Sequence, residues 1–327
     1  MRWFLLVQMT SHTVIGVQGI ALRAARGPIA DGGTLRHDKV LFPGIVFTMT
    51  DKTIADQWQE SASGWARWAA VASGYMVPIT EQMLDGAGVM AGSRVLDVGC
   101  GSGEQTVLAA KRVGPNGHVL AIDIAAPMIA AAERTIGAAG LTNVSTRVCA
   151  ADAVADADET FDAVISRLVL MLIPDSVGAA RAVLRTLHPG GRFAAIVIGD
   201  PAKANFGSKA LDILARHGGI TEWEDKPGSI RSLSHPDRLR AVLTAAGFTD
   251  VAVVPVQTTR RMESAEQMTT MIRDGFAFYK GLVAHLPPAA QEAAWAEVLQ
   301  TLKPFEGPDG FIGPEEYNLA IGRKPLA

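Results

Sequence analysis

The chain has 327 residues, of which 48% are hydrophobic and 19% are charged, and its formal net charge at pH 7 is -3. This length and composition indicate a soluble globular fold with a real core, whereas a general nucleic-acid surface would normally be basic. The two cysteines, Cys100 and Cys149, exclude a disulfide framework and a cysteine-built zinc site. No apolar run reaches the roughly 18 residues of a membrane span. We expect a cytoplasmic protein with no metal, no nucleic-acid partner and no membrane span.

The first residues differ in composition from the rest. Residues 1–30 contain Arg2, Arg23 and Arg26 but no acid, and the apolar stretch 3–7 is too short for a signal sequence. We interpret residues 1–50 as a flexible extension outside the core, with a transit peptide as the alternative. Because Met49 directly precedes the first convincing helix, we expect the functional protein to begin near it, with one domain over residues 51–327.

From Lys52 onward the apolar residues follow a helical spacing, which continues past Pro78. Short apolar runs then alternate with helical patterns. The expected strands are 93–98, 118–123, 143–149, 161–166 and 192–199, and the expected helices between them are 104–112, 127–139 and 176–186. Strands that alternate with helices of about 10–15 residues indicate a parallel sheet with helices on both faces.

After residue 199 the alternation loosens. The pattern predicts helices at 208–217, 237–246, 264–286 and 289–302, and strands at 248–256 and 317–323. The expected fold is therefore α/β, with a doubly wound, mostly parallel sheet of seven strands. The additional helical segments, about 203–235 and 263–303, are expected to gather with the helices before the first strand as a lid over one edge of the sheet.

The first predicted strand ends in a glycine-rich turn, Val95-Leu96-Asp97-Val98-Gly99-Cys100-Gly101-Ser102-Gly103. In open α/β sheets, ligands bind at the carboxyl ends of the strands. Glycines let the backbone approach a ligand closely, and the following helix start suits a carboxylate. Asp97 can accept hydrogen bonds from an ammonium group, Asp123 from a ribose diol, and Asp152 from an adenine amino group. Three acids at three successive strand ends point to an adenosyl amino-acid ligand.

The rival ligand for such a turn is a dinucleotide. The nicotinamide fingerprint needs glycines in the pattern G-x-G-x-x-G, but here the pattern is G-x-G-x-G, with Glu104 where the third glycine should fall. Asp97 also precedes the first glycine. Both features favour S-adenosylmethionine (SAM) over NAD.

These residues resemble the class I SAM-dependent methyltransferases of the broad ubiquinone/menaquinone-biosynthesis-like group, which have a Rossmann-like methyltransferase fold. The resemblance covers about residues 55–260. It is carried by the glycine-rich turn, by Val119-Leu120-Ala121-Ile122-Asp123 with Met128 five residues on, by Ala151-Asp152-Ala153, by Phe161-Asp162-Ala163-Val164-Ile165-Ser166 and by Leu187-His188-Pro189-Gly190-Gly191. His188 departs from the usual Arg or Lys of that last turn, a structural position.

The resemblance implies how the cofactor would be held. The Gly99–Gly103 turn would pack on the methionine moiety, and Asp123 and Asp152 would bind ribose and adenine. Ile124 and Ala153 would flank the adenine ring, and Arg167 and Leu168 would face the cofactor. The full set of expected cofactor-binding residues is Asp97, Gly99, Cys100, Gly101, Gly103, Asp123, Ile124, Met128, Asp152, Ala153, Arg167 and Leu168.

The methyl acceptor is harder to infer, because in-line methyl transfer depends largely on alignment and desolvation and needs no general base. Asp200, His217 and His285 are weak candidates for a catalytic role. The chain lacks the Asn/Asp-Pro-Pro-aromatic signature of DNA amino-methylating enzymes, and neither cysteine is placed to act as the nucleophile of a pyrimidine carbon-5 enzyme. Arsenic methylation, which needs several cysteines, is disfavoured for the same reason.

The expected lid is apolar. Met268, Met271, Ile272, Gly275, Phe276, Tyr279 and Val283 fall on one helical face, and Trp58 and Trp65 mark the first helix. These residues are either core contacts or part of a pocket for a hydrophobic molecule. We expect a methyltransferase for a small hydrophobic acceptor such as a phenol, quinone precursor, polyketide or terpenoid. A SAM-binding protein with another activity, or with no catalytic role, is the alternative, and the oligomeric state, possibly a homodimer, stays open.

Overall fold

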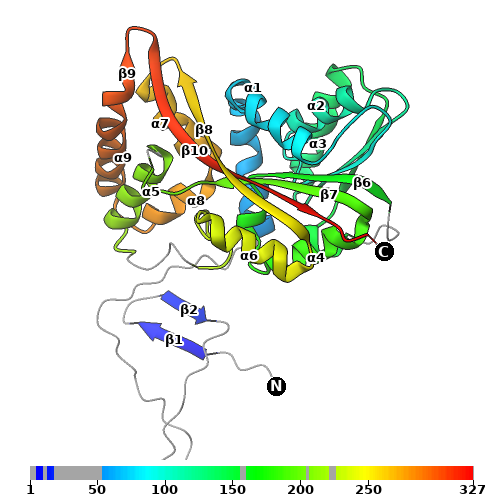
Figure 1. Cartoon of the computed structure of the whole chain (residues 1–327). Coiled ribbons are helices and arrows are strands. Elements are labelled where there is room, and N and C mark those ends of the chain that lie inside the picture. The colour runs from blue at the N-terminus through cyan, green and yellow to red at the C-terminus, as the bar shows by residue number, and fades with distance from the viewer. Residues whose placement is uncertain are drawn as a thin grey trace, which may run out of the picture. The chain divides into compact units, whose positions relative to one another are not determined.

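The structure, a computed structural model, describes residues 5–9, 13–17, 54–154, 160–203, 206–220 and 226–326 (Figure 1). They belong to two compact units, residues 1–52 and 53–327. In the first unit, β1 (Leu5–Met9) and β2 (Thr13–Val17) pair antiparallel, with Leu5 opposite Val17. Both strands lie within the segment interpreted above as a flexible extension, and Val and Ile favour extended backbone. The remainder of the expected extension, Met49 included, lies outside the described residues.

The second unit contains a sheet in the order β5-β4-β3-β6-β7-β10-β8. The strands are β3 (Arg94–Val98), β4 (His118–Asp123), β5 (Val144–Val148), β6 (Phe161–Arg167), β7 (Leu187–Ile198), β8 (Thr249–Met262) and β10 (Gly310–Arg323). The first five pair parallel, and β10 pairs antiparallel with β7 and β8. The two-residue β9 (Glu306–Gly307) adds to β10. This arrangement confirms the expected mostly parallel α/β sheet.

Helices cover both faces of the sheet. One core unites buried strand residues with α4 (Ser176–Thr186) and α6 (Pro236–Ala246). The opposite core packs the strands against α1 (Ile54–Gly86) and α2 (Glu104–Val113), and α3 (Ala126–Ala138) lies beside β4 and β5. Adjacent strand residues alternate between the two cores, as Leu96 and Val95 do. The fold is doubly wound as expected.

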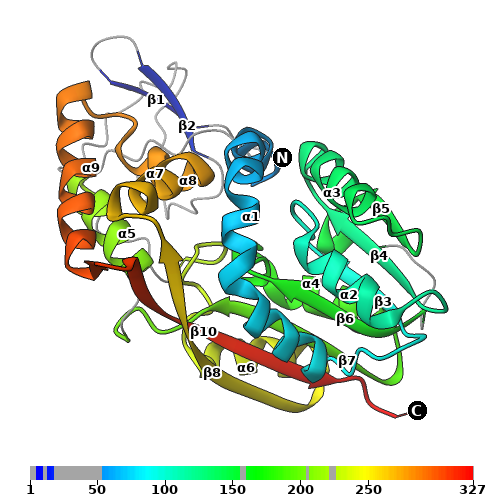
Figure 2. The same cartoon turned by 90° about the horizontal axis from the view of Figure 1, so that it is seen from above.

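A third core lies away from the sheet's centre. It is built by α5 (Phe206–His217), α7 (Ala265–Gly275), α8 (Ala277–Val283) and α9 (Pro288–Leu302), which we call the lid helices. Figure 2 shows α1 between these helices on one side and α2 and α3 on the other, and α1 contacts both groups. The helix expected over 264–286 is two helices, because the chain leaves the helical conformation at Phe276. Among the described residues, no helix is long and apolar enough to cross a membrane.

β7 begins at Leu187, five residues before the expected start at 192, and two further strands are longer than the sequence pattern indicated. β8 continues six residues past 256, and β10 begins seven residues before 317. The extensions pair with each other from Phe311 opposite Met262 to Glu316 opposite Gln257. Polar residues such as Arg260 and Glu315 interrupt the apolar alternation that marks a strand, so the pairing rather than local sequence sets these ends. The extensions bring β8 and β10 to the lid helices.

Candidate functional site

A cavity of about 360 Å³ lies between the carboxyl ends of the parallel strands and the lid helices. Its lining comes from α1, from the loops after β3, β4, β5 and β6, from α5, α7 and α8, and from the extended parts of β8 and β10. This size falls within the usual range of small-molecule pockets, about 300–1,000 Å³. The cavity thus joins the edge of the sheet where a ligand is expected to the helices of the expected lid.

The glycine-rich turn forms part of the cavity wall. Gly99 has φ +72°, and a Cβ there would lie 2.3 Å from a methyl carbon of Val169, so only glycine fits. Gly101 has φ +55°, and the nearest atom to a Cβ there would be Trp65 Nε1 at 3.8 Å, which leaves its face open. Gly99, Cys100 and Gly101 line the cavity, whereas Gly103 packs against Ala132 of α3. Burial raises the pKa of the Cys100 thiol, which agrees with a packed rather than a reactive cysteine.

Asp97 lies behind this turn and not in the cavity wall. Its carboxylate is fully buried and accepts hydrogen bonds from Thr106 Oγ1 at 2.6 Å and from Gln105 Nε2. Burial raises its pKa from 3.8 to about 6, although these two hydrogen bonds act in the opposite direction. Gln105 lines the cavity in front of it. The carboxylate therefore ties β3 to the first turn of α2.

Asp123 lies at the end of β4 and lines the cavity. Its Oδ2 accepts a hydrogen bond from the Gly101 N–H at 3.0 Å, and its Oδ1 accepts one from the Ala125 N–H at 2.9 Å. Burial raises its pKa, which these backbone donors counteract. Each carboxylate oxygen has a second acceptor position. Asp123 can thus accept hydrogen bonds from a diol while its orientation is fixed by the glycine-rich turn.

The residues expected around an adenine ring meet at one end of the cavity. Ile124 and Met128 line it from the β4–α3 side, and Asp152 lines it from a short 3-10 turn, Ala151–Ala153. Ala153 belongs to the same turn but does not contribute to the wall. The apolar side chains and the acid are of the types that would flank a purine and accept from its amino group.

Arg167 and Leu168 line the cavity where β6 ends. Arg167 Nη1 donates to Thr80 Oγ1 of α1 at 2.8 Å, and burial lowers its pKa, opposed mainly by Glu104 and Asp97. Leu168 has φ +62°, an unusual conformation for a residue with a branched side chain, and its N–H donates to the Ile196 carbonyl at 2.8 Å. Strained backbone of this kind often marks functional sites.

The structure adds a polar cluster that the sequence analysis missed, formed by Tyr75, Arg260, Glu315 and Tyr317, all in the cavity wall. Arg260 Nη2 donates to Glu315 Oε2 at 2.7 Å and to Tyr317 Oη at 3.1 Å, and the Tyr317 hydroxyl donates to Glu315. The guanidinium lies 4.5 Å from the ring centre of Tyr75. The length of β8 and β10 and the packing of α1 bring these residues together, and no local sequence pattern indicated it.

The three weak catalytic candidates lie outside the cavity wall. Asp200 is a turn residue whose Oδ1 accepts from the Ala202 N–H at 2.9 Å. His217 contacts Glu297 of α9 at 2.8 Å, and His285 is exposed. None of the three faces the cofactor residues. In the described parts of the chain, no group of three or more His, Cys, Asp or Glu side chains could hold a metal ion.

The apolar face expected on the lid contributes both to the hydrophobic core and to the wall of the cavity. Met268, Ile272, Phe276 and Tyr279 line the cavity, as do Trp58 and Trp65 of α1, whereas Met271 and Val283 are buried in the lid core. The Trp65 and Phe276 rings meet edge to face, with centroids 5.2 Å apart.

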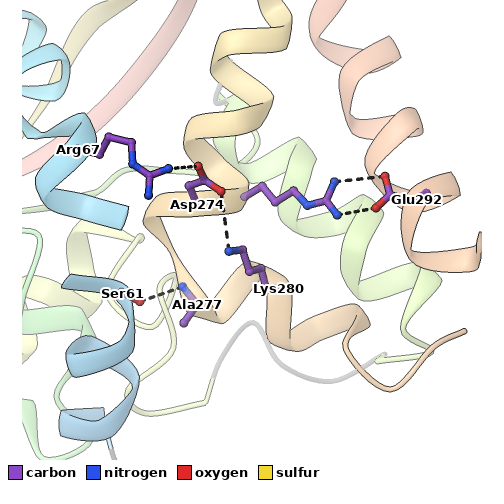
Figure 3. Close-up of polar contacts among 7 residues, drawn as sticks. Ser61, Arg67, Asp274, Ala277, Lys280 and Glu292 are labelled. Atoms are coloured by element: carbon purple, nitrogen blue, oxygen red, sulfur yellow. Dashed lines mark hydrogen bonds and ion pairs between the residues drawn. The ribbon is translucent and has the colours of Figure 1, made fainter. Parts of the chain in front are cut away.

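Polar contacts hold α1 against the lid helices (Figure 3). The Ala277 N–H donates to Ser61 Oγ at 3.0 Å, and Arg67 pairs with Asp274 at 3.0 Å. Lys280 approaches the other oxygen of Asp274 at 3.9 Å, so one carboxylate contacts cations from α1 and α8. Of these residues, Ser61 and Ala277 also line the cavity.

Comparison with known proteins identifies the class. Residues 90–230 match a family described as a methyltransferase domain. An arsenite methyltransferase of Halobacterium salinarum is 34% identical over 52% of this chain and 40% of its own length. Aklanonic acid methyltransferase DauC of a Streptomyces species is 33% identical over 44% of the chain and 64% of its own length. The ubiquinone/menaquinone biosynthesis C-methyltransferase UbiE of Cronobacter sakazakii is 31% identical over 51% of the chain and 71% of its own length.

Solved structures agree on the fold. A Haemonchus contortus phosphoethanolamine N-methyltransferase 2 superposes with a TM-score of 0.53 at 18% identity, over 87% of this chain and 62% of that one. A putative methyltransferase of Bacillus halodurans gives 0.51 at 17% identity, over 76% of this chain and 99% of that one. The fold and the sequence matches therefore define a class I SAM-dependent methyltransferase. Within that class the chain belongs to the UbiE-like family, which confirms the resemblance found in the sequence.

Proposed function

We propose that the protein transfers a methyl group from SAM to an oxygen or carbon atom of a small, largely apolar metabolite and releases S-adenosylhomocysteine. The observation that carries this proposal is the single cavity that joins Gly101 and Asp123 to the apolar side chains of the lid helices. A donor bound at the sheet edge and an acceptor bound among the lid residues would share that space.

The residues present fit SAM. The open face at Gly101 allows a ligand to approach the backbone, and the Asp123 carboxylate is held in the cavity wall by two backbone N–H groups. Ile124 and Met128 supply an apolar surface, with Asp152 beside it. When bound, SAM supplies an electrophilic methyl group on its sulfonium.

The side chains that line the cavity would align the acceptor and exclude water. Tryptophan, phenylalanine and methionine side chains dominate the lid side of the cavity, and methionines adapt to irregular shapes. No histidine of the described residues lines the cavity, so we propose transfer driven by alignment and not by a dedicated base.

The acceptor class follows from chemistry and from the relatives. DauC acts on aklanonic acid and UbiE functions in quinone biosynthesis, according to their names. Of these two kinds of molecule, a quinone suits an apolar cavity better because it has no carboxylate. One relative is an arsenite methyltransferase. Because this chain has only two cysteines, one buried in the glycine-rich turn, we keep the prediction that arsenite is not its acceptor.

The test is incubation of the full-length protein with SAM labelled in its methyl group and a panel of phenols, quinols, polyketides and arsenite. We expect label in a phenol, quinol or polyketide product. Transfer to arsenite alone would overturn the acceptor class. Tight SAM binding with no transfer to any of these compounds would instead favour a protein that uses the fold for another reaction or only for binding.

A further inference from the structure

We propose that Arg260, with Glu315, Tyr317 and Tyr75, forms the subsite that recognises an uncharged oxygen of the acceptor, a carbonyl or hydroxyl group, and discriminates against a carboxylate. This inference rests on the proposed function, and it names the acceptor chemistry that the lid side of the cavity selects. The four residues come from α1, β8 and β10 and lie in the wall of one cavity.

Arg260 retains hydrogen-bonding capacity toward the cavity. Its side chain is 10% exposed, and its protein acceptors among the described residues, Glu315 and Tyr317, both take hydrogens from Nη2. Its Nη1 has no hydrogen-bond partner among the described residues and is not sealed from the cavity as the buried Nε is. Donors in a poorly solvated wall are usually paired, so an unpaired Nη1 there indicates a ligand contact. Because Arg260 lines the cavity, an acceptor oxygen is a suitable partner.

The charges explain why that oxygen should be neutral. The Glu315 carboxylate, with a side chain only 5% exposed, already compensates the Arg260 guanidinium at 2.7 Å. A second carboxylate brought to Arg260 would lie close to Glu315, and like charges in a poorly solvated site repel strongly. A carbonyl or hydroxyl oxygen can accept from Arg260 without this repulsion.

Tyr75 connects the subsite to the cofactor side. Its pKa is raised to about 12, mainly by burial, and it responds to the charges of both Arg260 and Arg167. It is therefore neutral at pH 7, and its hydroxyl, which has no hydrogen-bond partner among the described residues, is free to donate. The rings of Tyr75 and Phe206 lie 4.5 and 5.1 Å from the Arg260 guanidinium and restrict its position.

The competing explanation is that the cluster only stabilises the pairing of β8 with β10. Arg260 is paired with Gly313, and Glu315 with Thr258, so the two side chains are diagonal neighbours on one face of the sheet. A purely stabilising cluster would affect stability but would not discriminate between ligands. The decisive measurement is therefore ligand preference.

The probes are 1-naphthol, naphthalene and 1-naphthoate, which share one ring system and differ in the oxygen group. Their affinities are measured by calorimetry on the full-length protein saturated with S-adenosylhomocysteine. We expect the wild type to bind 1-naphthol roughly tenfold more tightly than naphthalene, as one hydrogen bond to a charged group implies, and more tightly than 1-naphthoate. A wild type without either preference overturns the proposal.

Two variants and a control test which groups produce this ligand preference. Arg260→Lys keeps a positive charge beside Glu315 but removes the Nη1 donor, and it should lose the preference for 1-naphthol over naphthalene. Glu315→Gln removes the compensating charge and should reverse the preference toward 1-naphthoate. The matched control is Arg261→Met, whose side chain is exposed on the opposite face of β8 and should leave all three affinities unchanged. If neither Arg260→Lys nor Glu315→Gln changes the preference, the cluster only stabilises the strand pairing.

Binding of S-adenosylhomocysteine is measured for each variant in the same experiment. Normal cofactor binding with no discrimination among the probes overturns the subsite and leaves the proposed function intact. Failure of the wild type to bind S-adenosylhomocysteine overturns both.

Discussion

At the scale of single residues, two acids in neighbouring strands have different environments. Asp97 is fully buried and its oxygens accept from Thr106 and Gln105. Asp123 lines the cavity and accepts from backbone N–H groups only. We therefore expect Asp123 to contribute directly to ligand affinity and Asp97 to act mainly on the fold.

Replacing Asp123 should weaken cofactor binding. The variant Asp123→Ala removes a charged hydrogen-bond acceptor, and each such bond is worth roughly 1.5–3 kcal/mol, so the Kd for S-adenosylhomocysteine should rise at least tenfold in calorimetry. Asp309→Ala is the control, because Asp309 is exposed and lies outside the cavity wall, and it should leave binding and turnover unchanged. Unaltered affinity in Asp123→Ala would contradict the assignment of this carboxylate to the ribose.

Asp97 should make stability depend on pH. Burial raises its pKa from 3.8 to about 6, so the folded state holds this proton more tightly than the unfolded state does. Its contribution to stability is then fully present below pH 4 and is lost as pH rises through about 6. The free energy of unfolding of the wild type, relative to Asp97→Asn, should fall by about 3 kcal/mol over that range, at 1.36 kcal/mol per pKa unit. Urea unfolding from pH 4 to 7 measures this, and a constant difference would refute it.

At the scale of elements, α1 connects the lid helices with the sheet. A Cβ on Gly64 of α1 would lie 2.0 Å from the Asp274 carbonyl oxygen at the end of α7. A Cβ on Gly86, the last residue of α1, would lie 2.6 Å from a carbon of the Ile321 side chain of β10. A glycine in its first half and another at its C-terminal end therefore let this helix approach its two neighbours closely.

The contact at Gly64 can be tested with a control in the same helix. Gly64→Ala forces α1 and α7 apart and should lower the free energy of unfolding by about 1–3 kcal/mol, the usual cost of overpacking. At Gly74 a Cβ would meet nothing within 4 Å, so Gly74→Ala should be neutral or stabilise by up to about 1 kcal/mol through helix propensity. Equal effects of the two substitutions in urea unfolding would show that the approach of α1 to α7 does not limit stability.

At the scale of the whole molecule, the lid core and the sheet cores of residues 53–327 are joined by α1 and by the long strands β8 and β10. Elements that cross between cores favour a single cooperative transition. The described tryptophans, Trp58, Trp65, Trp68 and Trp295, all belong to α1 or the lid helices. Trp3 and Trp223 lie outside the described residues, so both are replaced by phenylalanine in the protein used. Its fluorescence then reports on one part of the unit, whereas far-ultraviolet circular dichroism reports on the whole chain.

We expect the two probes to give coincident thermal transitions. S-adenosylhomocysteine at about 100 times its Kd should stabilise the protein by about 2.7 kcal/mol and raise both midpoints together. A fluorescence transition at a lower temperature than the dichroism transition would mean that the lid helices unfold separately. A cofactor effect on the dichroism transition alone would lead to the same conclusion.

The sequence by itself determined the strand–helix alternation, the position of the glycine-rich turn and the acids at the strand ends. These are local properties, because they depend on the spacing of apolar residues and on turn chemistry within a few residues. Nine of the twelve expected cofactor residues accordingly lie in the cavity wall, including Asp123, Asp152 and Arg167.

Only the tertiary structure decided what surrounds those residues. Asp97 is turned toward α2, and Gly103 packs on α3. Tyr75, Arg260 and Glu315 share one wall of the cavity. All of these positions depend on contacts between segments far apart in the chain. The register of β8 on β10 places Arg260 beside Glu315, and the packing of α1 brings Tyr75 to both. No local pattern encodes such a register, because it results from side chains of distant segments being buried together. The residues expected to bind the methyl donor could therefore be predicted from the sequence, whereas those expected to bind the acceptor could be identified only from the tertiary structure.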